Sequence, residues 1–466
     1  MIMLFIWFQL IFSLGWTLPN PPPNIIVLVT DDQRWDALGY AGNPIIHTPE
    51  QDRLAQEGTY FKRAFSTTPI CAASRASILT GMYERTHGYT FGPNALDSIY
   101  NQKNYAFELK KNGYKTGFFG KLGIFHDGNL TQSFSEFEVY DRNTDFKDQR
   151  GYFYKTLGRD TVHLTRYTGQ KALDFIENTS KEQPFCLSIS FSAPHAHDGA
   201  WEGIQKQYFW QKDFDEYYAD LVISNAPTDT KEQFDALPQK VKEGMNRTRW
   251  HWRFDTPEKY QESVKGYYRM ISGVDRELGL IRALLQKKGI ADNTIIIWIG
   301  DNGYFLGDKQ LAGKWLMYDH AIGVPLMIYD PRVNQHYDVE DMVANIDLFP
   351  TIMEYAEITQ PPSSQGNSLV SYVATGQSQS KRKELLIEHL WDFDPIPSSE
   401  GLRTDRWKFL RYRNIEADYE LYDLINDPEE TTNLALSPEY SEKVQEMTRQ
   451  LEAAIRKYGP SANQAP

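Results

Sequence analysis

The sequence predicts an α/β protein with a large, mostly parallel central sheet flanked by helices, followed by a smaller C-terminal subdomain built on an antiparallel sheet. Short apolar runs alternate with helical patterns along most of the chain, which is typical of parallel βαβ units. Beyond about Ser380, apolar and polar residues alternate instead, as they do in antiparallel strands. The chain has 466 residues, more than one hydrophobic core usually accommodates, so we expect more than one domain.

Four apolar runs are predicted to form central strands, and polar residues follow each of them. In chain order, the runs with their polar ends are NIIVLVTDD (24–32), YKTGFFGK (114–121), FCLSISFSAPH (185–195) and NTIIIWIGDNG (293–303). One such ending would more often be a turn or a helix cap. Because ligands of open α/β sheets bind beyond the carboxyl ends of the strands, four endings with different chemistries predict a site at one edge of the sheet.

Helical patterns separate and follow these strands. SVKGYYRMISGVDRELGLIRALLQKKG has apolar residues at spacings of three and four and is predicted to be a helix that ends at Gly289. CAASRASILTG follows a turn-forming TTPI and is predicted to begin another helix. Near the C-terminus, ELLIEHL, RWKFLRY and YELYDL are predicted strands, and SEKVQEMTRQLEAAIRKYG is a predicted helix. We expect the main α/β domain over 24–375 and the C-terminal α+β subdomain over 376–466.

The first residues form an apolar block of signal-peptide length, and a proline-rich stretch follows it. We expect residues 1–20 to direct export, to the periplasm or out of the cell. No Lys or Arg precedes Arg34 and no clear cleavage site is present, so an uncleaved anchor is an alternative, although the block is short for a stable membrane span. The 49 basic and 62 acidic residues give a net charge of −13, which disfavours nucleic acid as a partner.

The acidic strand ends predict a metal site. Asp31, Asp32, Asp301 and Asn302 offer hard oxygen atoms, which suit Ca²⁺, or alternatively Mg²⁺, better than zinc. A bound cation would relieve the repulsion between the carboxylates. The alternative is that the carboxylates are neutralised by ion pairs with Lys121 or Arg75.

Cys71 is one of only two cysteines, and it opens the predicted helix that also carries Arg75. The two side chains share a helix face. A helix N-terminus and a guanidinium both suit an anion, so Cys71 stands where a nucleophile attacking that anion belongs. The alternatives are a packed, unreactive thiol and a thiolate catalyst like that of the cysteine hydrolases. Cys186, inside an apolar strand, is expected to be a buried thiol.

These motifs resemble those of the type I sulfatases, which belong to the alkaline phosphatase superfamily. CAASR at 71–75 matches the family's Cys-x-Ala/Pro-Ser-Arg signature, and LTG follows it at 79–81. TDDQRWDALGYAGN, GK, APH, GDNG and GKWLMYD occur in the family's order along the chain. The resemblance covers about residues 24–332, and GLRTDRWKFLRY with YELYDLINDPEETTNL resembles the family's C-terminal subdomain. It implies an alkaline-phosphatase-like fold and the hydrolysis of sulfate esters.

The resemblance also implies an unusual nucleophile. Cys71 would be oxidised to formylglycine by a formylglycine-generating enzyme or an anaerobic sulfatase-maturating enzyme. One hydroxyl of the hydrated aldehyde would attack sulfur and expel the alcohol, and the other would allow inorganic sulfate to leave. A plain serine would be left as a stable sulfate ester, so this chemistry needs the modified residue.

The family's remaining site residues carry over to matching positions of this chain. The implied ligands of Ca²⁺ are Asp31, Asp32, Cys71, Asp301 and Asn302. Arg75 would position the nucleophile, Lys121 and Lys314 would neutralise sulfate oxygens, and His195 would protonate the leaving alcohol. The chain departs from the family after its GK pair, where it reads GKLGIFHDG. His126 is therefore assigned to the second hydroxyl only as a hypothesis.

The substrate is less well defined by the sequence. NRTRWHWRFD concentrates arginine and aromatic side chains, and Arg249, Trp250, His251 and Arg253 are expected to line a wall that binds an anionic glycan. A packed aromatic cluster with solvated arginines is the alternative. Together with export, this region favours a sulfated poly- or oligosaccharide as the substrate. A phosphoester or phosphonate ester hydrolase of the same superfamily and an inactive glycan-binding relative are the alternative functions.

Overall fold

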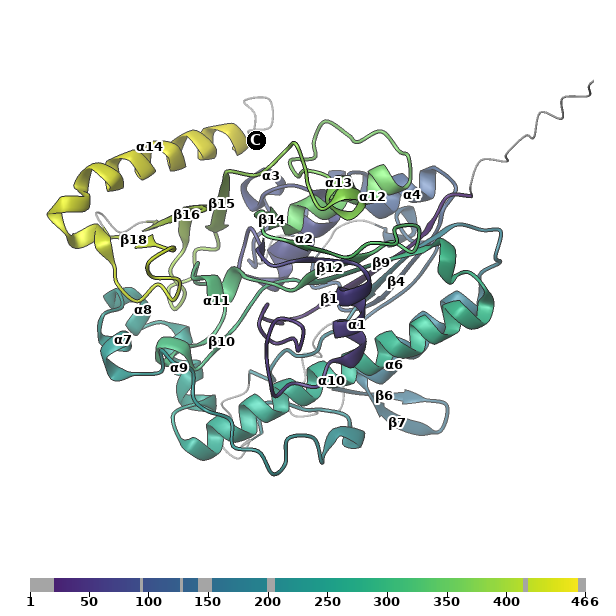
Figure 1. The fold of residues 1–466 in the computed structure, drawn as a ribbon, viewed down its shortest axis with the longest axis horizontal. Helices are drawn as coiled ribbons and strands as arrows, with labels where there is room; N and C mark the ends of the chain where they lie inside the picture. The colour runs from purple at the N-terminus through teal and green to yellow at the C-terminus, as the bar shows by residue number, and fades with distance from the viewer. Residues whose placement is uncertain are drawn as a thin grey trace, which may run out of the picture.

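The structure of the protein is a computed structural model. It describes residues 21–92, 95–125, 129–140, 153–198, 206–413 and 418–459. Within these ranges, the chain folds around two separate sheets, one large and one small (Figure 1).

The large sheet has eight strands in the order β13-β2-β12-β9-β1-β8-β4-β5. Their bounds are Asn24–Thr30 (β1), Thr59–Phe61 (β2), Lys115–Gly120 (β4), Glu136–Val139 (β5), Phe185–Ser190 (β8), Thr294–Gly300 (β9), Leu326–Tyr329 (β12) and Tyr337–Val339 (β13). β1 lies between β8 and β9 and is parallel to both, and β4 is parallel to β8 and β5. β12 runs antiparallel to β9 and β2. The predicted mostly parallel central sheet is therefore confirmed.

Helices cover both faces of the large sheet, because its central strands are apolar on both sides. Ile26 and Leu28 of β1 pack on the face covered by α1 (Pro49–Glu57), α6 (Leu164–Asn178) and α10 (Pro257–Lys288). Ile25 and Val27 pack on the other face, covered by α2 (Cys71–Thr80), α4 (Tyr105–Lys111) and α12 (Leu348–Tyr355) (Figure 1). Burial on both faces explains why the strands are continuous apolar runs.

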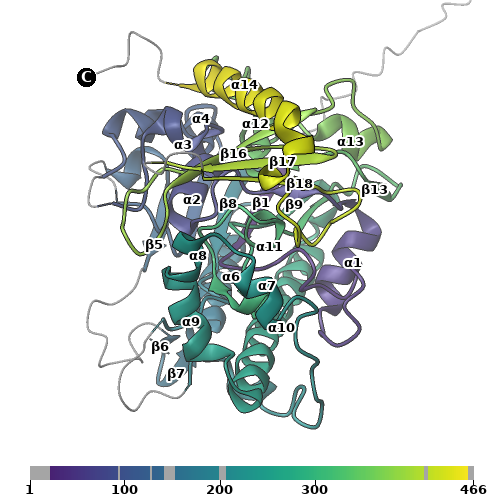
Figure 2. The same ribbon diagram turned by 90° about the vertical axis from the view of Figure 1, so that its left-hand side faces the viewer.

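The small sheet is antiparallel and has four strands in the order β15-β16-β17-β18. Its strands are Glu384–His389, Ser399–Thr404, Trp407–Tyr412 and Tyr419–Asp423, and α14 (Ser441–Tyr458) packs across it (Figure 2). The sequence predicted β15, β17, β18 and α14. It missed β16, SEGLRT, whose polar composition hides strand residues that are nearly all buried.

Short helices and two-stranded pairs lie between these longer elements along the chain. The helices are α3 (Glu84–His87), α7 (Lys231–Asp235), α8 (Gln239–Lys242), α9 (Met245–Arg253), α11 (Asp319–Ile322) and α13 (Val370–Thr375). The two-stranded pairs are β3 (Ala64–Phe65) with β14 (Val343–Ala344), β6 (Tyr154–Leu157) with β7 (Asp160–His163), and β10 (Phe305–Leu306) with β11 (Ala312–Gly313). None of the helices in the described ranges combines the length and the apolar character that a bilayer span requires.

Candidate active site

The polar residues that end the central strands lie together at one edge of the large sheet. Asp31 follows β1, Lys121 follows β4, and Asp301 follows β9, and all three are buried. The backbone continues the parallel ladder past the strand ends: Asp301 N–H donates to Thr30 (2.9 Å), and Lys121 N–H donates to Ser190 (2.9 Å). The predicted meeting of the four strand ends at one edge of the sheet is therefore confirmed.

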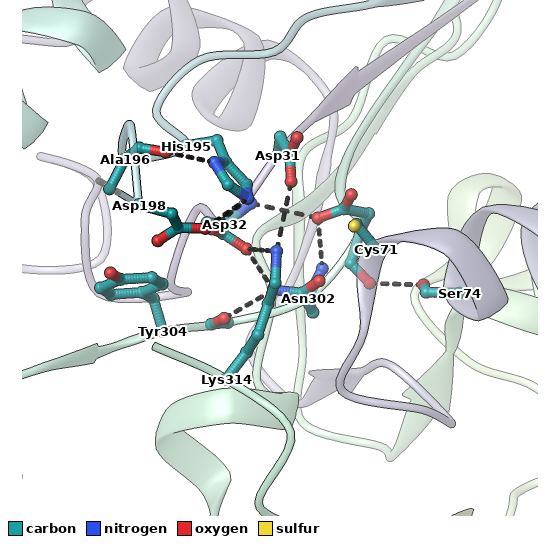
Figure 3. A network of polar contacts seen from close by, with 12 residues as sticks. Asp31, Asp32, Cys71, Ser74, His195, Ala196, Asp198, Asn302, Tyr304 and Lys314 are labelled. Carbon is teal, nitrogen blue, oxygen red and sulfur yellow. Dashed lines mark hydrogen bonds and ion pairs between the residues drawn. The ribbon is translucent and has the colours of Figure 1, made fainter. Parts of the chain in front are cut away.

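Cys71 is the first residue of α2 and is only 4% exposed. Its sulfur lies 3.7 Å from Nζ of Lys121. In Figure 3, Cys71 is on one side of the cluster of carboxylates, and His195 with Asp198 is on the other. Ser74, one turn further along α2, donates a hydrogen bond to the backbone carbonyl of Asp301. The helix start is thus fastened directly to the carboxyl end of β9.

Arg75 joins three strand ends. Its Nε donates to Oδ2 of Asp301 at 2.8 Å, and its Nη1 donates to the carbonyl of Lys121 at 2.7 Å and to the hydroxyl of Ser190. Its guanidinium is buried, and although burial alone disfavours the charge, the carboxylates of Asp301 and Asp31 raise the pKa of Arg75 above its usual value. Arg75 is therefore a permanent positive charge beneath Cys71.

Two lysines meet the first carboxylates. Lys121 Nζ lies 2.5 Å from Oδ2 of Asp31. Lys314 Nζ lies 2.5 Å from Oδ1 of Asp32 and 3.7 Å from Oδ1 of Asp31 (Figure 3). Burial opposes charge on Asp31, but Lys121 and its other cationic neighbours hold the pKa of that carboxyl below its ordinary value. The ion pairs anticipated as the alternative to a metal are present.

His195 is held through one ring nitrogen and leaves the other facing the site. Nδ1 lies 2.6 Å from the carbonyl of Ala196, so Nδ1 carries the proton and donates it there. Nε2 lies 3.7 Å from Oδ2 of Asp32 and 3.8 Å from Oδ2 of Asp198. Burial, together with the charge of Lys314, lowers the pKa of His195 well below its usual value. Nε2 is therefore the ring nitrogen that faces the carboxylates.

The donor set fits a hard cation. Oδ1 of Asp31 and Oδ1 of Asn302 are buried oxygens that accept no hydrogen bond among the described residues. Asp31, Asp32 and His195 each offer a ligand atom, and these three atoms lie within 4.8 Å of one another. Buried oxygens without donors carry a free-energy cost that a cation would remove. This oxygen-rich set is typical of Ca²⁺ or Mg²⁺ sites.

Asp301 has a different environment from the other acidic residues. Its Oδ1 accepts the backbone N–H groups of Asp32 (3.1 Å) and Asn302 (2.8 Å), and its Oδ2 accepts Arg75. Burial and the neighbouring charge of Asp31 raise the pKa of Asp301 to about 6. Burial likewise raises the pKa of Asp32. Since a divalent cation stabilises the ionised form of a carboxyl, it would reverse both shifts.

The four residues predicted to bind substrate all lie on α9, in three different environments. Arg249 and Arg253 both ion-pair with Asp198, at 2.8 Å for Arg249, and Arg253 is completely buried. Trp250 is also buried. His251 lies on the exposed side of the helix and pairs with Asp255 at 3.3 Å. The structure therefore brings the two arginines to the neighbourhood of His195, but not Trp250 or His251.

Asn246, at the start of α9, holds the loop that carries Lys314. Its Nδ2 donates to the carbonyls of Ala312 (3.1 Å) and Lys314 (2.8 Å). Gly313 between them has a φ of 100°, a left-handed conformation that favours glycine. Arg247 Nη1 also donates to the carbonyl of Gln310, at 3.1 Å. The loop's path, and with it the position of Lys314, depends on α9.

Sequence reasoning missed Asp198 and the structural part played by Asn246. Asp198 lies three residues after His195, and its charge could have drawn attention to it, but the arginines that bind it are about 50 residues away. Asn246 belongs to an Asn-x-Thr triplet, and that pattern carries no information about burial. His126 lies outside the described residues. Cys71 and Cys186 are both buried free thiols, not a disulfide.

Comparison with known families matches most of the chain. The sulfatase family matches residues 23–358, and the family described as N-sulphoglucosamine sulphohydrolase, C-terminal, matches residues 307–457. An N-acetylglucosamine-6-O-sulfatase of Bacteroides thetaiotaomicron is 25% identical, over 94% of this chain and 87% of the relative. An arylsulfatase of Clostridium perfringens is 27% identical, over 91% of this chain and 92% of the relative.

Solved structures share the fold. A structure described as a complex with its substrate D-glucosamine-2-N,6-O-disulfate superposes with a TM-score of 0.78 at 22% identity, covering 94% of this chain and 98% of that chain. The phosphonate monoester hydrolase of Agrobacterium radiobacter superposes with a TM-score of 0.74 at 21% identity, covering 94% of this chain and 96% of that chain. These likenesses extend over both sheets.

Proposed function

The chain belongs to the sulfatase family and hydrolyses sulfate esters, and we propose that its substrate is a sulfated oligo- or polysaccharide. Its relatives include an N-acetylglucosamine-6-O-sulfatase and an ulvan-active sulfatase of Formosa agariphila, the latter 25% identical over 94% of this chain and 82% of the relative. The observation that carries the proposal is the convergence of Cys71, two lysines and His195 on one cluster of buried carboxylates. It supports chemistry on an anionic ester.

The proposal includes a formylglycine made from Cys71 and a bound Ca²⁺, with Mg²⁺ as the alternative. When present, they would supply an oxygen nucleophile and the positive charge that polarises it. Asp31, Asp32, Asp301 and Asn302 would hold the cation. The two buried oxygens support this assignment, because neither accepts a hydrogen bond from the described residues. Arg75 would fix the start of α2 through its bonds to Asp301 and to the carbonyl of Lys121.

Lys121 and Lys314 would bind the sulfate oxygens. Both ammonium groups lie at the carboxylates, and Lys121 is also 3.7 Å from the sulfur of Cys71. Sulfate esters carry a single negative charge, and further charge develops on the departing oxygen as the ester bond breaks. Two buried ammonium groups stabilise that change better than solvent could, because they are already oriented by the carboxylates they pair with.

His195 would hold the proton that the leaving alcohol needs. The carbonyl of Ala196 fixes the ring, so Nε2 is the atom that exchanges protons with the substrate. Asp198 lies beyond Nε2 and is itself neutralised by Arg249 and Arg253. The negative charge of Asp198 is therefore balanced mainly by the two arginines. The hydrogen bond from Nδ1 to the carbonyl of Ala196 keeps the ring oriented so that Nε2 faces the carboxylates.

The same proposal extends to the partners and location of the protein. Cys71 is buried once the chain has folded, so a formylglycine-generating or anaerobic sulfatase-maturating enzyme would have to act on the chain before it folds. Export to the periplasm or out of the cell would place the enzyme where polymeric glycans are found. We further propose that residues 24–375 form the catalytic domain and 376–466 the C-terminal subdomain.

Mass spectrometry of the tryptic peptide AFSTTPICAASR (64–75) tests the nucleophile. Protein co-expressed with a maturation enzyme should give a lighter peptide, in which one oxygen replaces the sulfur and two hydrogens, or the hydrate of that aldehyde. Cys71→Ala is the control and should show no such species. An unmodified thiol in protein that hydrolyses sulfate esters would overturn the assignment of Cys71.

Hydrolysis of matched esters tests the reaction class. Converted protein should release sulfate from sulfated oligosaccharides and from 4-nitrophenyl sulfate, and hydrolyse 4-nitrophenyl phosphate and phenylphosphonate esters more slowly. Faster cleavage of the phosphorus esters would favour the phosphoester or phosphonate hydrolase alternative. Binding of glycans without release of sulfate would favour the inactive glycan-binding alternative.

A further inference from the structure

Two exposed aromatic rings and one partly buried ring lie together where the small sheet meets the segment after α3. We name Phe91, Trp391 and Phe393 the aromatic platform. Phe91 is 43% exposed and Phe393 is 40% exposed, whereas large apolar side chains of this protein are mostly buried. The rings of Trp391 and Phe393 are nearly parallel, 3° apart, with centroids separated by 4.5 Å, and Phe91 meets Trp391 edge to face at 5.1 Å.

The aromatic platform is continuous with the candidate active site. Trp391 packs against a small buried cluster that contains Ile70, Ala73 and Trp315. Ile70 and Ala73 flank Cys71 in the chain, and Trp315 directly follows Lys314. The backbone N–H of Trp315 also donates to the carbonyl of Pro69, at 2.8 Å. One buried cluster therefore links the platform to the chain segments that carry Cys71 and Lys314.

The segment that carries Trp391 and Phe393 is held at three points. The N–H of Leu390 donates to Glu84 of α3 at 3.3 Å, and the N–H of Ile396 donates to the carbonyl of Phe393 at 2.7 Å. The N–H of Met245, at the start of α9, donates to the carbonyl of Pro395 at 2.7 Å. Because the rings are already ordered, binding a ligand to them costs little conformational entropy.

Acidic and basic side chains both lie at the platform, and Arg413 Nη1 donates to the carbonyl of Leu390 at 3.3 Å. Asp392 and Asp394 are exposed and alternate with the two rings along the chain. Asp394 pairs with Lys240 at 2.8 Å, and among the described residues no ion pair is formed by Asp392. A sulfate group placed beside Asp392 would be repelled, whereas the apolar C–H face of an uncharged sugar ring would stack on exposed aromatic rings without such a cost.

We propose that the aromatic platform is a sugar-binding subsite that takes an uncharged pyranose ring of the same glycan whose sulfated unit lies at Cys71. This inference rests on the proposed function, since it assigns the next sugar of that substrate. Contiguous exposed aromatic surface of this kind marks a binding site more often than it marks ordinary surface. The platform would favour glycans long enough to place a second sugar on it, and would favour those in which this second sugar carries no sulfate.

The test compares a double variant, Phe91→Ala with Phe393→Ala, with wild-type protein, both as converted enzyme. The small substrate is 4-nitrophenyl sulfate, which ends before the platform. The large substrates are sulfated disaccharides and tetrasaccharides of N-acetylglucosamine, galactose and rhamnose, each with and without a second sulfate on the neighbouring sugar. Phe137→Ala is the matched control, because Phe137 is 39% exposed on the edge strand β5.

The double variant should lose about tenfold in kcat/KM, mainly through KM, on the best-cleaved oligosaccharide, and stay within about twofold of wild type on 4-nitrophenyl sulfate. Phe393→Tyr should retain the wild-type value on both. Equal loss on both substrates, loss in the Phe137→Ala control, or oligosaccharides cleaved no better than the aryl ester would overturn the subsite.

A preference for the disulfated oligosaccharides would overturn the part of the proposal that concerns charge. Failure of wild-type protein to hydrolyse any sulfate ester would instead overturn the proposed function itself. Association with another protein through the same surface is the competing explanation of the exposed rings, and it predicts normal kinetics for the double variant on every substrate.

Discussion

Asn246 and Lys314 are joined by a hydrogen bond of 2.8 Å, from the side-chain amide of the first to the backbone carbonyl of the second. The bond links α9 to a loop in which Lys309, Gln310, Gly313 and Trp315 all have positive φ values. Such a backbone is unfavourable for residues other than glycine and persists only where its surroundings hold it. The loop that carries Lys314 is therefore held in place by α9, which is not part of the large sheet.

Asn246→Asp should lower kcat/KM on 4-nitrophenyl sulfate by about tenfold or more, because a carboxylate would face two carbonyl oxygens in place of a donor. The midpoint of thermal unfolding, Tm, should fall as well, since the site is buried. Thr248→Ala is the control, because Thr248 is exposed on the same helix. Activity of Asn246→Asp within twofold of wild type would show that the loop holds Lys314 without α9.

Asp198→Asn should reduce kcat by about tenfold with a smaller change in KM, because it leaves Arg249 and Arg253 as buried charges with a neutral partner beside His195. Steady-state kinetics on 4-nitrophenyl sulfate measures the effect. Asp255→Asn removes a carboxylate from an ion pair near the end of α9 and should be near wild type. An unchanged kcat in Asp198→Asn would show that the charge of Asp198 beside His195 and the arginines does not affect the reaction.

Removal of divalent cations should abolish hydrolysis and lower Tm, and Ca²⁺ should restore both. A cation that binds only the folded protein stabilises it by about 2.7 kcal/mol at a concentration of 100 times Kd. The measurement is a Ca²⁺ titration of chelator-treated protein, followed by thermal unfolding and activity, with Mg²⁺ in parallel. Asp31→Asn should lose the Ca²⁺ response. A Tm and an activity that ignore both cations would contradict the metal site.

The ion pairs of His320 predict a pH dependence of stability. Burial alone would lower the pKa of His320, but Asp308 at 3.2 Å and Glu429 at 3.3 Å raise it to about 9. Since this value lies above the ordinary 6.5, the stabilisation is fully present below about pH 6.5 and is lost as the pH rises through about 9.

His320→Gln should therefore cost on the order of 2 to 3 kcal/mol at pH 6 and much less at pH 9.5. Thermal unfolding of the two proteins at both pH values gives the difference. His336→Gln is a suitable control, because His336 pairs with Asp338 at the surface. A penalty for His320→Gln that is the same at both pH values would contradict this account of the ion pair.

The sequence was sufficient to predict the strands that carry the site, because β1, β4, β8 and β9 are buried on both faces and leave continuous apolar runs. Cys71 at the start of α2 was predictable for a similar reason, since a turn precedes it and helix-forming residues follow. The end of α10 at Gly289 was also predicted, and Gly289 has a φ of 66°, the left-handed conformation that ends helices.

The features that the sequence did not reveal depend on contacts between distant segments. β12 is a short antiparallel strand within a parallel sheet, and its direction follows from neighbours rather than from its own residues. Asp198 gains its importance from arginines on α9, and Asn246 from a loop about 70 residues later. The ion pairs of Lys121 and Lys314 could be expected as a class of interaction, but not assigned to particular carboxylates.

The direction of β1 decides how the enzyme would face any support attached to its N-terminus. Asn293, before β9, donates to the carbonyl of Pro22 at 3.2 Å, so the chain enters the fold at the end of the sheet opposite to Asp31. The seven residues of β1 place roughly 20 Å between that entry and the catalytic edge. If a tether, a bead or a membrane surface were joined before Pro21, the catalytic edge would face away from that support. Large polymers could then reach the catalytic edge without passing between the protein and the support.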